Sequence, residues 1–381
     1  MAMLYMLLAV LAIATSVAAF SASPAASFAV RHMSMSVAPK KVLVIGGTRF
    51  SGLYLWKELF SRGHDVTLFN RGKTAFAKIP SESEEMFQKR TAAVKVINGD
   101  RTKPEDLQKL ASHKFDVIYD MNGREATDTA PLADMFNGKI EQFIYMSSAG
   151  VYKKSVSMPH IEDDAEDVKS RHKGKLETEA YLKKINIPFT SIRPTYIYGP
   201  MNYNPLEEYF FERLEQGRPV CIPGHGQHVT GLGHVEDLAI AMAQVIGRKH
   251  CNGQIYNIQD RQSVTFEGLA MLCAQAMGKK TEEVTIKNYD KKMFDFGEKK
   301  NFPMREQHFF CSVDKAMKDL EWAPKFNMLN GLKDSYNADF LVKKGKGKLK
   351  NDFTCDDMVL LDDRIEVKVY DAIPRDDLVS K

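Results

Sequence analysis

The sequence has few cysteines, little net charge and no apolar run long enough to span a membrane. Its five cysteines are odd in number, widely spaced and form no CxxC pair, which argues against a disulfide framework and against a zinc site. The apolar run at residues 4–14 is too short to cross a bilayer. Because the net charge is only +4 over 381 residues, any site for a polyanion must be a local patch.

Acidic residues are absent before Glu58, and the N-terminus has the composition of a targeting segment. The apolar run and the small residues after it predict a signal peptide at residues 1–19. Residues 20–38 begin with Phe20 and are rich in serine and alanine, which resembles the transit segment of a bipartite plastid presequence. We therefore expect the mature protein in the stroma of a chloroplast, in a complex plastid; simple secretion is the alternative.

Short apolar runs alternate with helical segments through the body of the chain. A first strand is predicted at residues 42–45, followed by a glycine-rich turn at 46–52 and a helix at 53–61. Further strands are predicted at residues 65–69, 94–97, 115–119 and 142–146. This order predicts an α/β fold with a doubly wound parallel sheet of the Rossmann type, whose ligands gather at the carboxyl ends of the strands.

The domain organisation follows from this pattern. We expect the Rossmann-type domain at residues 39–200 and a smaller C-terminal substrate lobe at residues 201–340, from which the chain returns to the sheet. Residues 341–381 are basic at first and then acidic, and we expect them to form a flexible tail. A hydrophobic content of 44% suffices for the core of one large domain or of two closely joined ones.

The glycine-rich turn predicts a dinucleotide site, although an arginine interrupts it. Extended short-chain reductases usually have a glycine where this chain has Arg49, since backbone amides there receive a pyrophosphate. The residues expected to contact a cofactor are Gly46, Gly47, Thr48, Arg49, Phe50, Gly52, Asn70, Arg71 and Asp100. Asn70 replaces the acidic residue that holds the ribose in NAD enzymes, and Arg71 follows it, so NADP is the better candidate. The alternative is an inherited turn without a ligand.

The chain also lacks the tyrosine that short-chain dehydrogenases and epimerases use as a proton donor. In that pattern the tyrosine precedes a lysine by four residues, and the ammonium lowers the pKa of the phenol. Here Arg171 precedes Lys175, and none of the 14 tyrosines has a lysine four positions on. A guanidinium stays protonated, so Arg171 cannot replace the phenol. Ser148, in the segment 147–152, keeps the place of the serine that polarises the substrate.

Four stretches are specific enough in combination to identify a family: residues 46–50, 147–152, 171–179 and 350–358. They resemble the chloroplast stem-loop-binding proteins. The resemblance implies an atypical short-chain reductase fold that binds RNA in plastids, associates with ribosomes and transcription complexes and forms large homo- or hetero-oligomers. It further implies endoribonuclease cleavage of stem-loops with a divalent metal, and the family shares the loss of the tyrosine.

Cationic side chains gather where a dehydrogenase would hold its substrate, which agrees with RNA binding. The residues expected to contact RNA are Arg49, Arg71, Lys73, Arg171, His172, Lys173 and Lys175. A cleft of this kind attracts a polyanion, and counterions are released on binding. The lysine-rich stretch at 343–350 is either a further basic arm or a solvated linker. Aromatic residues between Tyr196 and Phe211 are candidates for base stacking, although most are expected in the core.

Two carboxylates at strand ends are the candidates for hydrolysis of RNA. Asp100 and Asp120 end neighbouring predicted strands, with Asn122 just beyond, and would hold one hydrated Mg²⁺ against a phosphodiester. The alternative is that Asp100 caps a turn or contacts an adenine. With Ser148 and Lys175 these three residues form the predicted catalytic set. The alternative function is an NADP-dependent reductase or a sugar-nucleotide epimerase or dehydratase, which would need a substitute proton donor.

Overall fold

The computed structural model describes residues 37–363 and 367–369, and the chain divides into one unit at residues 1–38 and another at residues 39–381. The predicted signal peptide and nearly all of the predicted transit segment lie outside the described residues. Every described helix is too short or too polar to cross a membrane. All described helices and strands belong to the second unit.

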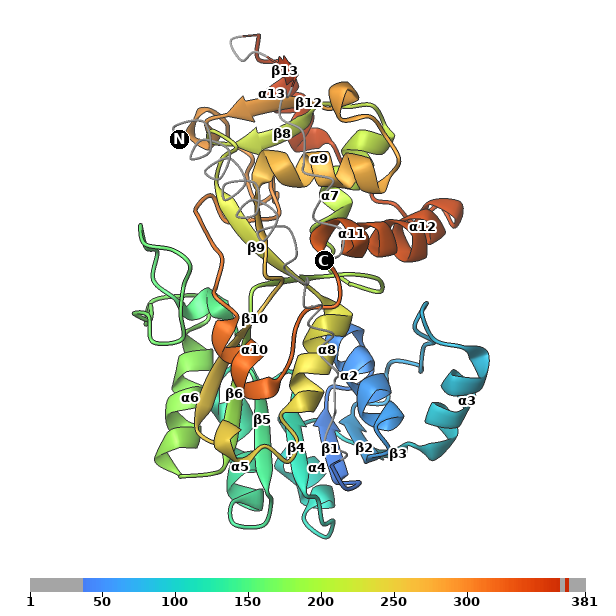
Figure 1. Cartoon of the computed structure of the whole chain (residues 1–381), viewed down its shortest axis with the longest axis vertical. Helices are drawn as coiled ribbons and strands as arrows, with labels where there is room; N and C mark the ends of the chain where they lie inside the picture. The colour runs from blue at the N-terminus through green and yellow to red at the C-terminus, as the bar shows by residue number, and fades with distance from the viewer. Residues whose placement is uncertain (1–36, 364–366, 370–381) are drawn as a thin grey trace, which may run out of the picture. The chain divides into compact units, whose positions relative to one another are not determined.

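A seven-stranded parallel sheet forms the base of the second unit (Figure 1). The strands are β1 (Lys41–Ile45), β2 (Asp65–Asn70), β3 (Lys95–Asn98), β4 (Val117–Asp120), β5 (Gln142–Met146), β6 (Phe189–Pro194) and β10 (Gln254–Ile258). Their order is β10-β6-β5-β4-β1-β2-β3, and every neighbouring pair is parallel. The order reverses between β1 and β4, where ligands of such sheets bind. The predicted doubly wound Rossmann-type sheet is confirmed.

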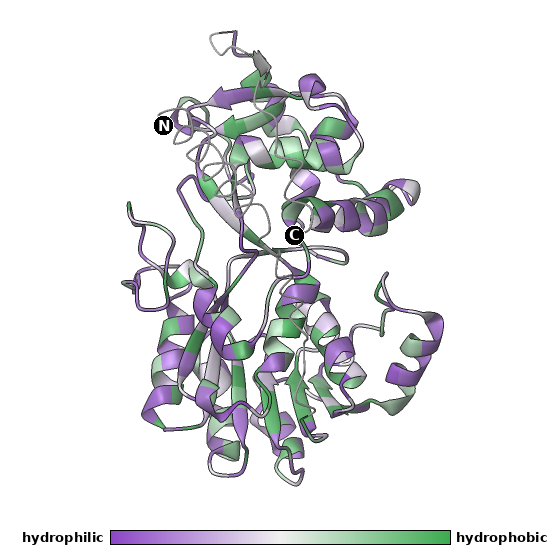
Figure 2. Cartoon of the chain, in the orientation of Figure 1, coloured by the Kyte–Doolittle hydropathy of each residue, from purple (hydrophilic) through white to green (hydrophobic). Residues whose placement is uncertain are grey.

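Helices cover both faces of the sheet, because alternate side chains of β1 enter two different cores. Val42 and Val44 contact the first core, whereas Leu43 and Ile45 contact the second. The helices of the first core are α2 (Phe50–Ser61), α8 (Val235–Gln244) and α10 (Asp314–Leu320), and those of the second are α4 (Pro104–Leu107), α5 (Ala126–Phe136) and α6 (Lys173–Lys184). Burial on both faces explains why β1 is apolar without interruption from Val42 to Ile45. In Figure 2 the middle strands of the sheet are accordingly largely green.

The C-terminal lobe holds two three-stranded sheets and a core of its own. The strands of one sheet are β8 (Val220–Pro223), β12 (Thr285–Tyr289) and β13 (Val367–Val369), and those of the other are β7 (Tyr196–Tyr198), β9 (Val229–His234) and β11 (Ser263–Thr265). The lobe's helices are α7 (Glu208–Glu215), α9 (Phe266–Ala276) and α11 (Met328–Ser335), followed by a π-helical turn at Tyr336–Phe340. Phe210, Phe211 and Phe266 are fully buried in this core, as expected for most of the aromatic series.

The chain passes between the sheet and the lobe more than once. After β9 it forms α8, which packs against α2, and then β10, which pairs with β6 at the edge of the sheet (Figure 1). It returns a last time as α10, which packs against β10. Between β2 and β3 the chain also makes an excursion that contains α3 (Glu84–Ala93). The region after residue 200 thus supplies both a lobe and part of the sheet.

Residues 341–360 pack on the lobe, whereas we expected residues 341–381 to form a flexible tail; residues 364–366 and 370–381 lie outside the described part of the chain. It contains α12 (Leu341–Gly345) and α13 (Thr354–Leu360). The Nζ atom of Lys343 lies 2.7 Å from a carboxylate oxygen of Glu208, so part of the basic arm is neutralised. Asp356 is buried and pairs with buried Arg213, with 2.5 Å between Oδ2 and Nη2. These ion pairs attach residues 341–360 to the fold.

Replacing Asp356 with asparagine should destabilise the protein by about 1.5–3 kcal/mol, since hydrogen bonds to buried charged groups have that value. The matched control is Asp357→Asn, because Asp357 lies next in sequence and pairs with Arg218 while its side chain is 57% exposed. This control should change stability by no more than about 0.5 kcal/mol. Urea unfolding measures both effects. Equal losses in the two variants would contradict a structural role for the buried pair.

Candidate functional site

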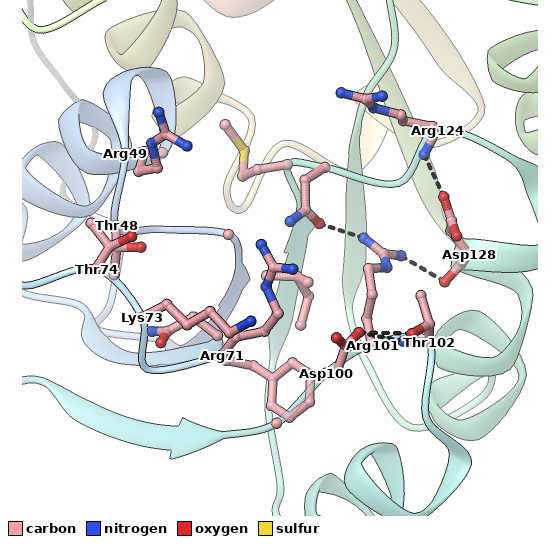
Figure 3. A pocket seen from close by; sticks show the side chains of 18 of the residues that line it. Thr48, Arg49, Arg71, Lys73, Thr74, Asp100, Arg101, Thr102, Arg124 and Asp128 are labelled. Atoms are coloured by element: carbon pink, nitrogen blue, oxygen red, sulfur yellow. Dashed lines mark hydrogen bonds between the residues drawn. The ribbon is translucent and has the colours of Figure 1, made fainter. Parts of the chain in front are cut away.

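A cavity of about 450 Å³ lies at the carboxyl ends of β1, β2, β3 and β4 (Figure 3). It is formed by the glycine-rich turn before α2 and by the residues that follow the three neighbouring strands. Five cationic side chains and two carboxylates line it: Arg49, Arg71, Lys73, Arg101 and Arg124, with Asp100 and Asp128. Its size falls within the range of roughly 300–1,000 Å³ that is usual for small-molecule sites. The surplus of positive charge favours an anionic ligand.

The glycine-rich turn has the geometry of a phosphate-binding turn at two of its positions. Gly46 has φ +90°, a conformation that residues with a Cβ rarely adopt. A Cβ on Gly52 would lie 2.3 Å from the carbonyl oxygen of Gly46, so only glycine lets α2 approach the turn this closely. Gly47 and Phe50 depart from the prediction, because neither lines the cavity. Gly47 packs against Leu68, and Phe50 belongs to the core of the sheet.

Arg49 occupies the position of the usual middle glycine and projects beside the cavity (Figure 3). Its guanidinium lies 4.5 Å from the centre of the Tyr203 ring, which also lines the cavity. The Tyr203 ring is 66% exposed and meets Phe50 edge-on, with 6.3 Å between centroids. Tyr203 is thus a member of the aromatic series that lies outside the core. The Arg49 guanidinium therefore covers one face of the Tyr203 ring, and both residues line the cavity.

The residues at the end of β2 line the cavity and include two of the predicted cations. Asn70 ends the strand and lines the cavity, and its Oδ1 accepts a 2.8 Å hydrogen bond from the backbone N–H of Gly72. The bond holds the turn that carries Arg71 and Lys73, whose side chains are exposed around the cavity (Figure 3). Neither side chain forms a salt bridge with any described residue. Both cations remain available to phosphate.

The metal site at Asp100 and Asp120 stays a prediction, and Arg101 competes with it because its guanidinium already neutralises the second carboxylate. Arg101 donates to both oxygens of Asp120, at 2.5 and 2.7 Å. Asp120 is fully buried, which by itself would raise its pKa, but the Arg101 guanidinium and further hydrogen bonds hold that pKa below its usual value. Asn122 accepts a third bond from Arg101 at 2.6 Å, and both residues line the cavity. The arginine therefore takes the place predicted for Mg²⁺.

Asp100 caps a turn, which is the alternative to metal binding that the sequence left open. Its Oδ1 accepts bonds from the backbone N–H and the hydroxyl of Thr102, at 3.1 and 2.8 Å, and these bonds lower its pKa. Among residues 37–363 and 367–369 no group of three or more histidine, cysteine, aspartate or glutamate side chains has the arrangement of a metal site. Arg101 was missed in the sequence. The feature that could have indicated Arg101 as a site residue is its position directly after Asp100, at the end of a strand.

Ser148 and Lys175 lie near the ends of β5 and β4 but are already bonded to backbone. The Ser148 hydroxyl accepts a 3.1 Å bond from the N–H of Gly150. The Nζ atom of Lys175 donates to the carbonyl oxygens of Gly123 and Met146, each at 2.6 Å. Burial, with the charges of Arg101 and Arg124 nearby, lowers the pKa of Lys175 to about 8. Lys175 is therefore a poor candidate for the phosphate contact that we predicted.

Arg171 precedes α6 rather than lying on it, because the helix begins at Lys173. The exposed Arg171 guanidinium lies against His172, with 3.1 Å between Nε and the Nε2 atom of the ring. Burial, Arg171 and Arg305 lower the pKa of His172 to about 4, so the ring is neutral at neutral pH. Lys173 is exposed at the start of the helix. The predicted cluster thus contributes Arg171 and Lys173 as exposed charges.

Arg305 and Lys300 extend this cluster from a segment more than one hundred residues away. Arg305 donates to the carbonyl oxygen of Gly150 at 3.3 Å and lies close enough to Arg171 for the two charges to repel. Burial and Arg171 also lower the pKa of Lys300. Neither forms a salt bridge within the described part of the chain. We call Arg171, Lys173, Lys300 and Arg305 the cationic surface; only the first two were predicted from the sequence.

Arg124 connects the cationic surface with the cavity. Its side chain lines the cavity, while its carbonyl oxygen lies 2.5 Å from where a Cβ on Gly174 would be. The loop that carries Arg124 therefore lies directly on the first turn of α6. Arg171 precedes this helix by two residues. The cavity and the cationic surface thus adjoin one another.

The sequence from residue 42 to residue 258 matches the NAD dependent epimerase/dehydratase family. The chain belongs to this family. The chloroplast stem-loop binding protein of 41 kDa b from Arabidopsis thaliana is 51% identical over 324 residues, which cover 84% of each chain. The predicted resemblance to the chloroplast stem-loop-binding proteins is confirmed by this similarity.

Solved structures of family enzymes share the fold. The dTDP-glucose 4,6-dehydratase of Bacillus anthracis in complex with NAD gives a TM-score of 0.65 at 17% identity, over 81% of this chain and 99% of that one. The UDP-glucose 4-epimerase of Thermotoga maritima gives a TM-score of 0.62 at 20% identity, over 80% and 99% of the two chains. At such low identity these similarities concern the architecture and not the reaction.

Proposed function

We propose that this protein binds RNA on the cationic surface and the adjoining mouth of the cavity. The observation that carries the proposal is a set of cations around one edge of the sheet that form no salt bridge with any described residue: exposed Arg49, Arg71, Lys73, Arg124, Arg171, Lys173 and Lys300, and half-buried Arg305. Unpaired cations of this kind repel one another in the free protein, and a polyanion relieves the repulsion. The name of the 51% identical relative, a stem-loop binding protein, supports RNA as that polyanion.

The position before α6 argues for binding rather than for reductase chemistry. Lys175 is present, but the residue four positions before it is Arg171, which does not exchange a proton at accessible pH. Loss of a general acid typically lowers a rate by about 10²–10⁴-fold. An NADP-dependent reductase or epimerase would therefore need another donor. We do not assign RNA cleavage to Asp100 and Asp120, since Arg101 occupies the oxygens of Asp120.

The cavity fits the phosphorylated adenosine half of a nicotinamide cofactor. Gly46 and Gly52 allow the backbone of the turn to approach a pyrophosphate. Asn70 replaces the acidic residue that would select NAD, and Arg71 and Lys73 follow it, which favours NADP. We propose that such a cofactor binds without turnover.

The presequence and the relative together suggest where the protein acts. Residues 1–38 have the composition of a bipartite presequence, and the relative's name describes a chloroplastic protein. We propose that the protein acts in a plastid stroma, in assemblies with ribosomes or transcription complexes.

The proposal predicts that a labelled stem-loop RNA binds the protein with an affinity that falls steeply with salt. Each phosphate neutralised should contribute roughly −0.7 to −0.9 to the slope of log K against log salt, so three or more contacts give a slope of about −2 or steeper. Fluorescence anisotropy titrations between roughly 50 and 200 mM salt check this slope. NADPH binding without RNA binding would contradict the proposal.

A further inference from the structure

Tyr203 is placed as a stacking surface at the entrance to the cavity. Its ring is 66% exposed, yet two contacts hold its orientation: the guanidinium of Arg49 at 4.5 Å and the edge of Phe50 at 6.3 Å. An aromatic ring held in this way loses little freedom when a planar group stacks on it. Nucleic-acid bases have such a planar face, whichever base is present.

The backbone is strained at the first residue of α2, whose side chain contacts Tyr203. Phe50 has φ +37°, which is unusual and strained for a bulky residue. Arg49, just before it, has an extended backbone, so the turn directs the Arg49 side chain toward Tyr203 and buries the Phe50 ring beneath. Strain of this kind persists where the surrounding structure over-determines it, and it concentrates at ligand sites.

The cavity behind Tyr203 suits the phosphates and the sugar of one nucleotide. Arg71, Lys73 and Arg124 line it and form no salt bridge with any described residue. Backbone amides at the start of α2 lie at the same end of the sheet as these cations. Base stacking at the mouth and cations behind it are the two requirements for holding a single nucleotide.

We propose that one unpaired nucleotide of a bound RNA enters this cavity, with its base on Tyr203 and Arg49 and its phosphate between Arg71 and Lys73. The inference rests on the proposed RNA binding, since the strand reaches the cavity from the cationic surface past Arg124. The same chemistry is present in a free nucleotide with a phosphate on its ribose. An RNA loop and NADPH therefore exclude one another, and the nucleotide pool regulates RNA binding.

The test compares two RNAs with equal numbers of phosphates, a hairpin with an unpaired loop and a blunt duplex, on the full chain. Tyr203→Ala should weaken hairpin binding by about 5-fold or more, the effect of losing one base stack, and leave duplex binding unchanged. Tyr203→Phe keeps the ring and should retain hairpin affinity. Because Tyr203 is largely exposed, both variants should melt within a few degrees of wild type, which thermal unfolding checks.

A second arm separates the two sources of the nucleotide. NADPH added to the protein should release the hairpin and leave the duplex bound, and NADH should do so more weakly because it lacks the 2'-phosphate. Two results would overturn the nucleotide subsite and leave the proposed RNA binding intact. One is unchanged hairpin affinity in Tyr203→Ala, and the other is NADPH that binds without displacing the hairpin. Failure of the wild-type protein to bind either RNA would instead overturn the proposed function, so the two failures are distinguishable.

Discussion

The double substitution Arg171→Glu with Arg305→Glu should lower the affinity for stem-loop RNA by about 100-fold. Each charge-assisted hydrogen bond to a phosphate is worth on the order of 1.5 kcal/mol, and tenfold in affinity corresponds to about 1.4 kcal/mol. The two guanidiniums lie close enough to repel each other, so they present their charges to the same stretch of a polyanion. Both are at least partly exposed, and reversal of their charge should leave the fold intact.

A control with the same change in net charge is Lys114→Glu with Lys249→Glu. Both lysines are exposed and precede β4 and β10, so they lie at the amino ends of the strands, opposite the cavity. The control should keep RNA affinity within a few fold at about 150 mM salt, where the screening length is about 8 Å. Anisotropy titrations of labelled RNA measure all variants. If the control lost as much affinity as Arg171→Glu with Arg305→Glu, the binding would depend on overall charge and not on the cationic surface.

Arg171→Tyr is the more discriminating single change. It restores a tyrosine four residues before Lys175, yet the position lies before the first turn of α6 and the Lys175 ammonium is bonded to two carbonyl oxygens. We expect weaker RNA binding, a salt slope reduced by about 1, and no reductase activity. Unchanged RNA affinity would mean that Arg171 is a remnant and that the RNA contacts lie elsewhere.

Asp120→Ala should destabilise the protein by about 3–5 kcal/mol, the usual cost of leaving one member of a buried ion pair alone. Arg101 would keep its charge while losing its carboxylate partner, since Asp120 accepts hydrogen bonds from it on both oxygens, at 2.5 and 2.7 Å. Typical domains are stable by only about 5–15 kcal/mol, so this variant should melt at a much lower temperature than the wild type. Thermal and urea unfolding measure the loss.

Asp100→Ala is the matched control for Asp120→Ala. Asp100 also follows a strand of the same sheet, but it is partly exposed and caps a turn through Thr102. Its loss should cost about 0.5–2 kcal/mol, like the loss of other caps. Similar small effects in both variants would contradict the structural assignment of Asp120 and would reopen the carboxylate pair as a site for chemistry.

The contrast between Asp100 and Asp120 also shows the limit of reasoning from strand ends. The sequence placed both carboxylates at one edge of the sheet, because strands of a parallel sheet end on the same side. It carried no indication that the side chain of Arg101 turns toward Asp120, nineteen residues away, and donates to both of its oxygens. A hydrogen-bonded pair of this kind depends on side-chain directions that only the packed strands and loops define.

Arg305 and Tyr203 illustrate the same limit for the binding surface. Arg305 lies between β12 and α10, and nothing local distinguishes it from other loop cations. Tyr203 belongs to an aromatic series whose other members are mostly buried, and its exposure follows from the way the chain leaves β7 and crosses above Phe50. Both residues became part of the site through contacts with segments far away in the sequence.

The parallel sheet, the glycine turn before α2, the missing proton donor at Arg171 and the cations after β2 were all predictable from the chain of residues. These features are local: strand periodicity, glycine spacing and residue type at a helix start require no knowledge of distant neighbours. Which charges are free and which are neutralised became clear only in the folded molecule. Folding pairs Arg101 with Asp120 and Arg213 with Asp356, and it leaves the cationic surface without salt bridges among the described residues. Charge pairing is decided over a few ångströms in space, and sequence separation carries no information about that distance.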